Sequence, residues 1–323
     1  MHVALFARDR LPVRNYGGTQ RIIVYLARGL AAAGHRVTLI AGAGSDVPEA
    51  ELVPLERAQL RRPDLDLRPL LPGGVEVLLS FTRLPQPPDV PWIRSLHGNR
   101  RPGVVGAPNT LYLSRNHAER HGATAFVYNG IDLAEFRYQP VKSGYDLFLG
   151  RLHAVKGHRW AIEGAKRTRR RLVVAGGWRL SLTRRVRYVG QVGGTTKAEL
   201  LAGANCLWMP ARWDEPFGLT LIEALASGTP VLGTRRGALP EVVSPEVGAL
   251  GDTLDELVAR RDGLDRIDPA ACRARVERHF THHVMAAEYL RMFREFVATG
   301  VLPAGRGIGA SAPTSGPAPE PAP

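Results

Sequence analysis

The fold is decided near the start of the chain by residues 2–41, which read HVALFARDRLPVRNYGGTQRIIVYLARGLAAAGHRVTLIA. Residues 2–7 are a short apolar run that predicts a strand, and a glycine turn at residues 15–19 follows it. Residues 20–33 then carry apolar side chains at helical spacing, and residues 36–41 predict the next strand. Strand, glycine turn, helix and strand form a βαβ unit, whose crossover requires parallel strands. The sequence therefore predicts an α/β fold.

The same alternation continues through two successive sheets. Further strand-like runs for the first sheet lie at residues 75–81, 92–97, 111–114 and 126–128. The second set comprises strands at 145–150, 171–175, 186–189, 206–210 and 231–233 and helices at 157–166, 196–204 and 217–226. Two doubly wound, Rossmann-like domains are expected to face one another across a cleft, which is the default ligand site of such sheets.

Domain boundaries follow from the breaks in this pattern. Residues 132–143 contain Pro140 and lack strong periodicity, so they predict the interdomain linker. The expected organisation is an N-terminal Rossmann-like domain at 1–140, a C-terminal Rossmann-like domain at 141–282, a terminal helix at 283–299 that packs back on the first domain, and a disordered Gly/Pro/Ala-rich tail at 300–323.

Composition narrows the class of protein. The chain has 323 residues, 44% of them hydrophobic, a formal net charge of +13 and a pI near 10.5. This charge predicts an anionic partner without choosing among nucleotides, nucleic acid and an anionic membrane. The two cysteines lack metal-ligand spacing and suit a reducing cytosol. Neither a signal-peptide core nor a membrane-spanning run is present, so we expect a cytoplasmic protein, with peripheral contact at the inner membrane face left open.

A second informative stretch, EPFGLTLIE at residues 215–223, lies at the start of a predicted helix. Pro216 fits the first turn of that helix because its missing N–H costs nothing there. A glycine two residues later lets a ligand approach the backbone, and the helix dipole favours negative charge at this end. We therefore expect an anion site at the backbone amides of Phe217, Gly218 and Leu219.

The two carboxylates of this stretch are expected to serve different parts of one elongated ligand. Glu215 precedes the helix and is placed near a sugar ring, whereas Glu223 lies about two turns along it and is placed near ribose hydroxyls. Composition alone leaves an alternative open, in which Glu215 only caps the helix and Glu223 is an ordinary surface glutamate.

Two cations form the second half of the predicted site. Arg151 follows the first strand of the second domain, and Lys156 opens the next helix. Positive charge beside a helix N-terminus is unfavourable unless an anion neutralises it, so both residues are candidates for binding a diphosphate. Solvated side chains remain the alternative, and they are the better interpretation of the basic runs at 166–171 and 184–187, which face water or an anionic membrane.

Two segments of the first domain are weaker candidates. The loop Tyr16-Gly17-Gly18-Thr19 is not a Gly-x-Gly-x-x-Gly fingerprint, so it argues against a dinucleotide cofactor, but Gly18 could approach a phosphate across the cleft. His97 ends a strand, where its imidazole could bond a sugar hydroxyl, and a structural histidine is an equal alternative.

The sequence predicts neither a metal nor a cofactor. Asp64 and Asp66 form an Asp-x-Asp pair, but they lie in a Pro-rich stretch without a strand pattern, so we interpret the pair as coincidence. No nucleophile elbow and no zinc-type His/Cys spacing are present.

Taken together, these motifs resemble the retaining glycosyltransferases of the GT-B fold, specifically family 4, the glycosyl transferases of group 1. The resemblance covers most of the chain and lies in the order of its motifs. These are Tyr16 to Thr19, His97-Gly98, Asn129 to Asp132 with Phe136, Gly150-Arg151 with Lys156-Gly157, Glu215 to Glu223, Gly237 to Glu241, and Arg275 to Phe280 with Tyr289.

The resemblance implies a hexosyltransferase that takes UDP-, GDP- or ADP-hexose and retains the anomeric configuration without a metal. Arg151 and Lys156 would then hold the diphosphate with Gly18 beside it, Glu223 the ribose, and Glu215 with His97 the transferred sugar. Nucleoside-base contacts would lie near Gln191 and Val192.

Two departures from the family pattern limit what the resemblance implies. The first domain is short between residues 55 and 75, which leaves a carbohydrate, a lipid or a small molecule open as acceptor. The segment 176–186 lacks a helix that is common in the family. A sugar-nucleotide-binding protein without activity and a GT-B epimerase or hydrolase are the alternatives. A specific nucleic-acid partner is not expected, because no recognition helix or aromatic-interleaved basic ribbon is present.

Overall fold

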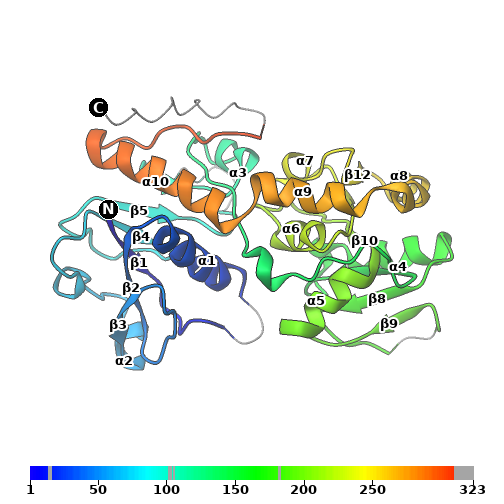
Figure 1. The fold of residues 1–323 in the computed structure, drawn as a ribbon, viewed down its shortest axis with the longest axis horizontal. Coiled ribbons are helices and arrows are strands. Elements are labelled where there is room, and N and C mark those ends of the chain that lie inside the picture. Colours follow the sequence, from blue (N-terminus) through cyan, green and yellow to red (C-terminus); the bar gives the residue numbers. More distant parts are fainter. Residues whose placement is uncertain (14–16, 101–103, 105, 181–182, 309–323) are drawn as a thin grey trace, which may run out of the picture.

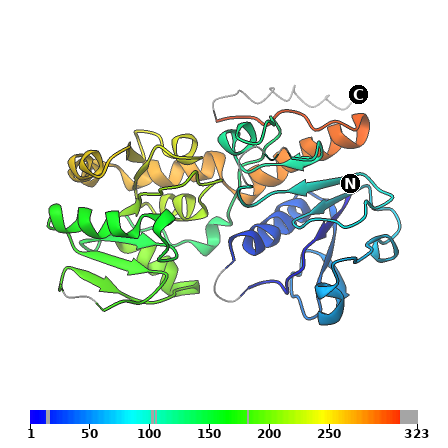
Figure 2. The same ribbon diagram turned by 180° about the vertical axis from the view of Figure 1, so that it is seen from behind.

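The structure is a computed structural model that describes residues 1–13, 17–100, 104, 106–180 and 183–308. It contains two lobes, as both views show (Figure 1, Figure 2). Each lobe is built on a six-stranded parallel sheet. The predicted α/β class with two Rossmann-like domains is confirmed.

The sheet of the N-terminal lobe has the strand order β3-β2-β1-β4-β5-β6. Its strands are β1 (His2–Phe6), β2 (Arg36–Gly42), β3 (Glu51–Leu55), β4 (Val77–Ser80), β5 (Trp92–Ser95) and β6 (Thr110–Leu111). The order reverses between β1 and β4, and this switch point is where open parallel sheets bind ligands, outside the carboxyl ends of the strands.

Helices cover the N-terminal sheet unequally. α1 (Gly18–Ala32) and α10 (His282–Thr299) pack against each other and share one apolar core with one face of the sheet. The other face has a smaller core, beside which lie α2 (Arg57–Arg61) and η1 (Arg68–Leu70). α3 (Arg115–Glu119) follows β6, and η2 (Leu133–Glu135) leads toward the second lobe.

The C-terminal lobe repeats the same topology in the order β12-β11-β10-β7-β8-β9. Its strands are β7 (Tyr145–Leu149), β8 (Leu172–Ala175), β9 (Val186–Tyr188), β10 (Ala204–Met209), β11 (Val231–Thr234) and β12 (Gly248–Gly251). The reversal here lies between β7 and β10, so the segments after these two strands border the second switch point.

Two layers of helices enclose this second sheet. Side chains of α4 (His158–Arg167), α8 (Leu254–Arg260) and η4 (Arg261–Arg266) share one core with one face. The other face packs with α5 (Gly194–Gly203), α6 (Leu219–Ala226), α7 (Leu239–Val242) and α9 (Pro269–His279). The short η3 (Ala154–Lys156) connects β7 to α4.

After α9 the chain returns to the N-terminal lobe, so α10 belongs to that lobe in space (Figure 1). The backbone amide of Ile131 donates to the carbonyl of Phe280, and the amide of His282 donates to the carbonyl of Ile131. Further along α10, the Tyr289 hydroxyl lies 3.1 Å from Ser95 Oγ on β5. Two segments, one around Ile131 and one around Phe280, therefore run side by side where the chain passes between the lobes.

Several predicted boundaries need correction. β3 and β12 were not expected, because Pro54 in the first and glycines at both ends of the second weaken the strand pattern. Residues 126–128 form only an isolated bridge rather than a sheet strand. α6 begins at Leu219, two residues later than predicted, so Pro216 lies outside its first turn.

The predicted tail also starts too early. Residues 300–308 pack along the N-terminal lobe: Leu302 is buried, and the amide of Gly305 donates to the carbonyl of Thr124. Arg291 holds the carbonyl of Ala304 at 2.8 Å. The expectation of disorder is therefore wrong for 300–308, because Leu302, Ile308 and backbone hydrogen bonds hold this segment to the first lobe. Residues 309–323 lie outside the described residues.

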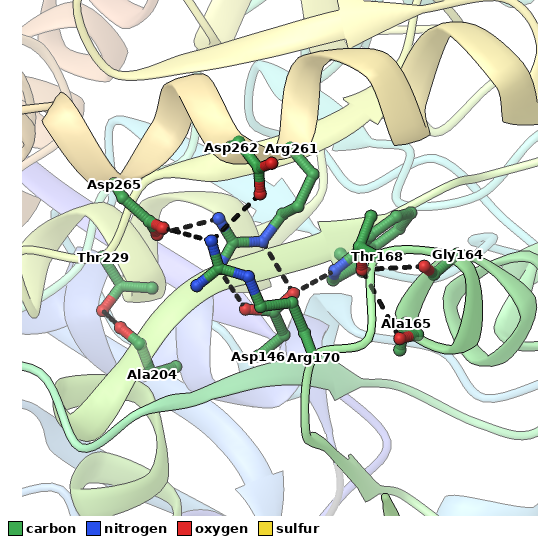
Figure 3. A network of polar contacts seen from close by, with 11 residues as sticks. Asp146, Gly164, Ala165, Thr168, Arg170, Ala204, Thr229, Arg261, Asp262 and Asp265 are labelled. Carbon is green, nitrogen blue, oxygen red and sulfur yellow. Dashed lines mark hydrogen bonds and ion pairs between the residues drawn. The ribbon is translucent and has the colours of Figure 1, made fainter.

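A buried ion pair joins the C-terminal sheet to η4 (Figure 3). Arg261 is fully buried, and its guanidinium donates to both oxygens of Asp146 on β7, at 2.7 and 2.5 Å. Trp208 Nε1 donates to the same carboxylate at 2.9 Å, and Asp265 accepts from Arg261 at 2.8 Å. Attraction to these carboxylates outweighs the burial of Arg261 and raises its pKa.

Candidate active site

A cavity of about 780 Å³ lies between the two lobes. Its walls come from the N-terminus of α1, the end of β5, the segments that follow β7 and β10, and the start of α6. The two switch points therefore face one another. Ten of the eleven predicted site residues line this cavity, namely Gly18, His97, Arg151, Lys156, Val192, Glu215, Phe217, Gly218, Leu219 and Glu223. Gln191 is exposed and is not among the lining residues.

Glu215 lines the cavity and is held there by two donors. Its Oε2 accepts from Lys156 Nζ at 2.6 Å and from Trp213 Nε1 at 2.9 Å. The ammonium of Lys156 also lies over the Trp213 ring, 4.7 Å from its centroid. These contacts fix the carboxylate next to a cation in the part of the cavity that borders η3.

The backbone of Glu215 is fixed by Gly237, which belongs to another motif of the sequence. Gly237 has a φ of +58°, and a Cβ there would lie 2.3 Å from both the amide nitrogen and the carbonyl oxygen of Glu215. The amide of Ala238 donates to that same carbonyl at 2.9 Å. A side chain at position 237 would therefore displace the acid, which explains why a glycine stands there.

Glu223, which also lines the cavity, is held by one cation from each lobe. Its Oε1 accepts from Lys197 Nζ on α5 at 2.9 Å and from Arg21 on α1. Glu223 is fully buried, and its Oε2 is a buried atom without a hydrogen-bond partner among the described residues. One carboxylate oxygen is thus occupied, and the other is left to accept from a ligand.

The electrostatics of this triad follow from burial and charge. Burial alone would raise the pKa of Glu223, but Lys197 and Arg21 outweigh it and lower that pKa. Burial likewise opposes the charge of Arg21, yet attraction to Glu223 raises its pKa. The pKa of Lys197 is lowered, because burial and the neighbouring Arg21 outweigh the attraction of Glu223. The two basic side chains therefore favour the ionised form of Glu223 against its burial.

The start of α6 gives the cavity an electropositive side. Gly218 caps the helix, and Leu219 and Thr220 form its first residues. The first amides of a helix have no intrahelical acceptor, so they are available to an anion. Gly18 abuts this point across the cleft, since a Cβ on it would lie 3.2 Å from Leu219 Cδ1. Arg151, which follows β7, is exposed and also lines the cavity.

His97 is neutral in this structure. Its Nε2 lies 3.0 Å from Ser95 Oγ, and its ring lies 5.4 Å from that of Phe81. Burial, together with the nearby His117, lowers the pKa of His97 to about 3. The imidazole can therefore exchange hydrogen bonds with a sugar, but it does not carry a proton charge at neutral pH.

Among the lining residues that the sequence analysis missed, three donate to the two glutamates. Arg21 stands three positions after Gly18 on α1, so helical spacing from the glycine loop could have found it. Trp213 stands two positions before Glu215 and could have been read as part of the same stretch. Lys197 carries no signal in the sequence, because only the packing of α5 against α6 brings it to Glu223.

The Asp-x-Asp pair is not among the residues that line the cavity. Asp64 is exposed and Asp66 is half-buried, and they pair with Arg62 and Arg68 at 2.9 and 2.8 Å. Within the described part of the chain, no group of three His, Cys, Asp or Glu side chains is placed to hold a metal ion. No helix in the described ranges is long and apolar enough to cross a bilayer. Tyr16 of the glycine loop lies outside the described residues.

Comparison with known proteins agrees with this geometry. Residues 145–267 match the family described as glycosyl transferases group 1. The glycogen synthase of Mycobacterium tuberculosis is 33% identical over 173 residues, which cover 46% of this chain and 41% of that protein. The chain thus spans less than half of that relative's length.

Solved structures are similar over nearly the whole chain. AviGT4, a glycosyltransferase involved in avilamycin A biosynthesis, is 28% identical with a TM-score of 0.77, covering 93% of this chain and 99% of that one. Anabaena Alr3699/HepE in complex with UDP-glucose is 15% identical with a TM-score of 0.65, covering 91% and 100%, and shows the fold alone. The predicted GT-B fold is confirmed, and the predicted resemblance to the group 1 glycosyltransferases is supported by the family match over residues 145–267 and by the structure of AviGT4.

Proposed function

We propose that the protein transfers a hexose from a nucleoside diphosphate sugar to an acceptor hydroxyl with retention of the anomeric configuration. The observation that supports this most directly is the pair of carboxylates in one cavity. Glu215 and Glu223 are each held by cations while facing the same interdomain space. Such an arrangement suits an elongated ligand with a sugar at one end and a ribose at the other.

The diphosphate is the part of the donor that carries charge. Arg151, Lys156 and the amides at the start of α6 are the groups that would bind it, and they approach the cavity from different walls. Fixed cations and amides stabilise a leaving diphosphate without reorganising, which is how preorganised sites lower a barrier. In this proposal they supply the positive charge that a metal ion would otherwise provide.

The transfer itself exchanges one C–O bond for another. The bond between the anomeric carbon and the diphosphate oxygen breaks, and the acceptor oxygen forms a bond to the same face of that carbon. The acceptor proton passes to the departing phosphate oxygen, so no separate base is needed. The developing oxocarbenium charge is stabilised by the Glu215 carboxylate.

Lys156 has two roles in this scheme. In the structure it neutralises Glu215, and in the donor complex it would be shared with the diphosphate, so the carboxylate gains a free lone pair facing the sugar. His97, neutral because of its burial, would exchange a hydrogen bond with a sugar hydroxyl from the opposite lobe. Val192 remains the candidate for contact with the nucleoside base, since it lines the cavity and Gln191 does not.

A thermal-shift screen tests this function. A ligand that binds only the folded state raises the midpoint by an amount set by its concentration over Kd. We expect UDP, GDP or ADP, and the matching hexose derivative, to stabilise the protein. Glu215→Gln should keep nucleotide binding. It should lose transfer of the sugar, and its hydrolysis of the donor should be slower than that of the wild type. If none of the three nucleotides shifts the midpoint, the proposed function is wrong.

A further inference from the structure

The short helix α3 of the N-terminal lobe contacts the acidic stretch of the C-terminal lobe at both of its ends. At the first end, Ser114 is fully buried, and its hydroxyl donates to the carbonyl of Pro216 at 2.8 Å. At the last end, Arg120 Nη2 lies 3.2 Å from Asp214 Oδ2. Pro216 and Asp214 are the two sequence neighbours of Glu215, so the helix brackets that residue from the opposite lobe.

Three successive carbonyls of this stretch each accept a hydrogen bond. Asn99 Nδ2 donates to the carbonyl of Asp214 at 2.7 Å, and the amide of Ala238 donates to that of Glu215 at 2.9 Å. The Ser114 hydroxyl binds the third carbonyl. Two of these three donors belong to the N-terminal lobe, so both lobes together fix the backbone that carries the Glu215 side chain.

The same helix is tied to the strand end that carries His97. His117, in the middle of α3, has its Nε2 3.3 Å from the carbonyl of Gly98. Arg120 Nη1 donates to Asn99 Oδ1 at 3.3 Å. The helix therefore contacts the neighbours of both residues that the proposed function places against the sugar, one in each lobe.

These contacts are expected to affect the reaction rate. The side chains of Arg120 and Asp214 are 35% and 34% exposed, and pairs at such positions contribute little to the free energy of folding. Neither they nor Ser114 are among the residues that line the cavity, so they do not touch a ligand bound there. A misplacement of about 1 Å caused by a substitution outside a site can lower a rate by about a hundredfold. Contacts that fix Glu215 against the opposite lobe therefore act on catalysis through geometry.

We propose that Ser114 and Arg120 are positioning residues of the transfer reaction. Through the two neighbours of Glu215, they hold its carboxylate at a set distance from His97. The carboxylate then lies where the oxocarbenium charge develops, while the imidazole meets the sugar from the other lobe. This inference rests on the proposed function for its chemistry, but the arrangement of the lobes that it requires can be measured without a substrate.

Hydrolysis of a nucleotide sugar tests the effect on the rate without a known acceptor. UDP-glucose, GDP-mannose and ADP-glucose are the probes, and the release of nucleoside diphosphate by the full chain is measured. We expect kcat to fall by about tenfold or more in Ser114→Ala and by about two- to fivefold in Arg120→Gln. The affinity for the nucleoside diphosphate should change by less than about twofold, since neither residue lines the cavity. Arg120→Lys keeps a positive charge opposite Asp214 and should restore most of the rate.

Two matched variants separate positioning from a general loss of stability. Ser80→Ala removes a buried hydroxyl that donates to the carbonyl of Thr82 at 2.7 Å, and Arg36→Gln removes an arginine that pairs with Glu51 at 2.7 Å. Both bonds stay within the N-terminal lobe. Ser80→Ala should therefore lower the thermal midpoint as Ser114→Ala does, whereas both controls should keep the wild-type kcat within about twofold.

The distance between the lobes gives a readout that needs no substrate. Nitroxide labels at Arg57→Cys on α2 and Glu163→Cys on α4 stand at exposed positions of different lobes. Cys206 and Cys272 are buried, so they do not react with the label. Double electron–electron resonance should give a longer or broader distance distribution in the two variants at the ends of α3 than in the wild type and the two controls.

The outcomes separate this proposal from the proposed function. Unchanged distance distributions in both Ser114→Ala and Arg120→Gln would overturn it, and so would changed distributions with the wild-type rate of hydrolysis. An equal loss of kcat in Ser80→Ala would also overturn it, because the effect would then be one of stability. If the wild type neither binds nor hydrolyses any of the three probes, the proposed function is wrong, and the distance distributions alone decide whether the ends of α3 set the arrangement of the lobes.

Discussion

The buried pair of Arg261 and Asp146 predicts a large and specific loss of stability in Arg261→Met (Figure 3). The substitution removes both charged bonds to Asp146 and leaves that carboxylate in the interior with Trp208 as its remaining donor. Removing one partner of a buried ion pair costs about 3–5 kcal/mol, because the other charge stays desolvated. A domain of this size loses about 3 °C of midpoint per kcal/mol, so we expect a decrease of about 10–15 °C.

Thermal and urea unfolding followed by circular dichroism measure this loss. The matched control is Arg170→Met, which also removes an arginine paired with Asp265, but at a side chain that is 34% exposed. An exposed pair contributes about 1 kcal/mol at most, so the control should lose about 3 °C or less.

A double variant tests whether the stranded charge is the cause. Asp146→Asn combined with Arg261→Met keeps an acceptor for Trp208 but removes the unpaired charge, so it should be more stable than Arg261→Met alone. If Arg261→Met unfolds no earlier than Arg170→Met, or if the double variant is the less stable one, the reasoning about this pair is refuted.

Four further predictions concern the cavity. Lys156→Ala should reduce transfer by about ten- to a hundredfold, because it loses a charged bond to the leaving group; wild-type rates would remove that role. Glu223→Ala should weaken nucleotide binding in calorimetry, and Lys197→Met should weaken it less, since Arg21 still holds Glu223 Oε1. Equal nucleotide affinity in the wild type and both variants would exclude the ribose assignment. Chelation with EDTA should leave transfer intact, and loss of activity would require a metal. The free energy of unfolding should fall as the pH falls from 6.5 to about 3, because burial lowers the pKa of His97 to about 3 in the folded protein and the unfolded chain therefore protonates this histidine first. A stability that does not change with pH, or the same slope in His97→Gln, would contradict this.

Much of the fold and part of the site follow from the sequence, because their signals are local. Apolar periodicity places the strands and helices of two βαβ series, and this alternation permits little besides parallel sheets covered by helices. Short motifs at strand ends also identify candidate residues such as Lys156 and Glu215, since parallel topology brings those ends to one edge. These predictions need no knowledge of distant contacts.

Some segments adopt a regular or ordered structure that their own sequence does not favour. β3 contains Pro54 and β12 is bounded by glycines, yet both complete sheet edges, where a lost donor or an unpacked position costs little. The tail at 300–308 lacks apolar periodicity, but it is held through Leu302 and backbone bonds to the first lobe. Pairing with a preformed surface decides these segments.

Only the tertiary structure decides which charges meet. Glu223 receives Arg21 from a helix 202 positions earlier in the chain and Lys197 from a neighbouring helix, and both bind the same oxygen. The sequence determines that acids, cations and glycines stand at the ends of strands and helices. The energy of two charges in a protein is set by their burial and their distance, not by their order along the chain. The packing of the two lobes and the exclusion of water therefore decide which acids are neutralised and which carboxylate oxygen stays free for a ligand.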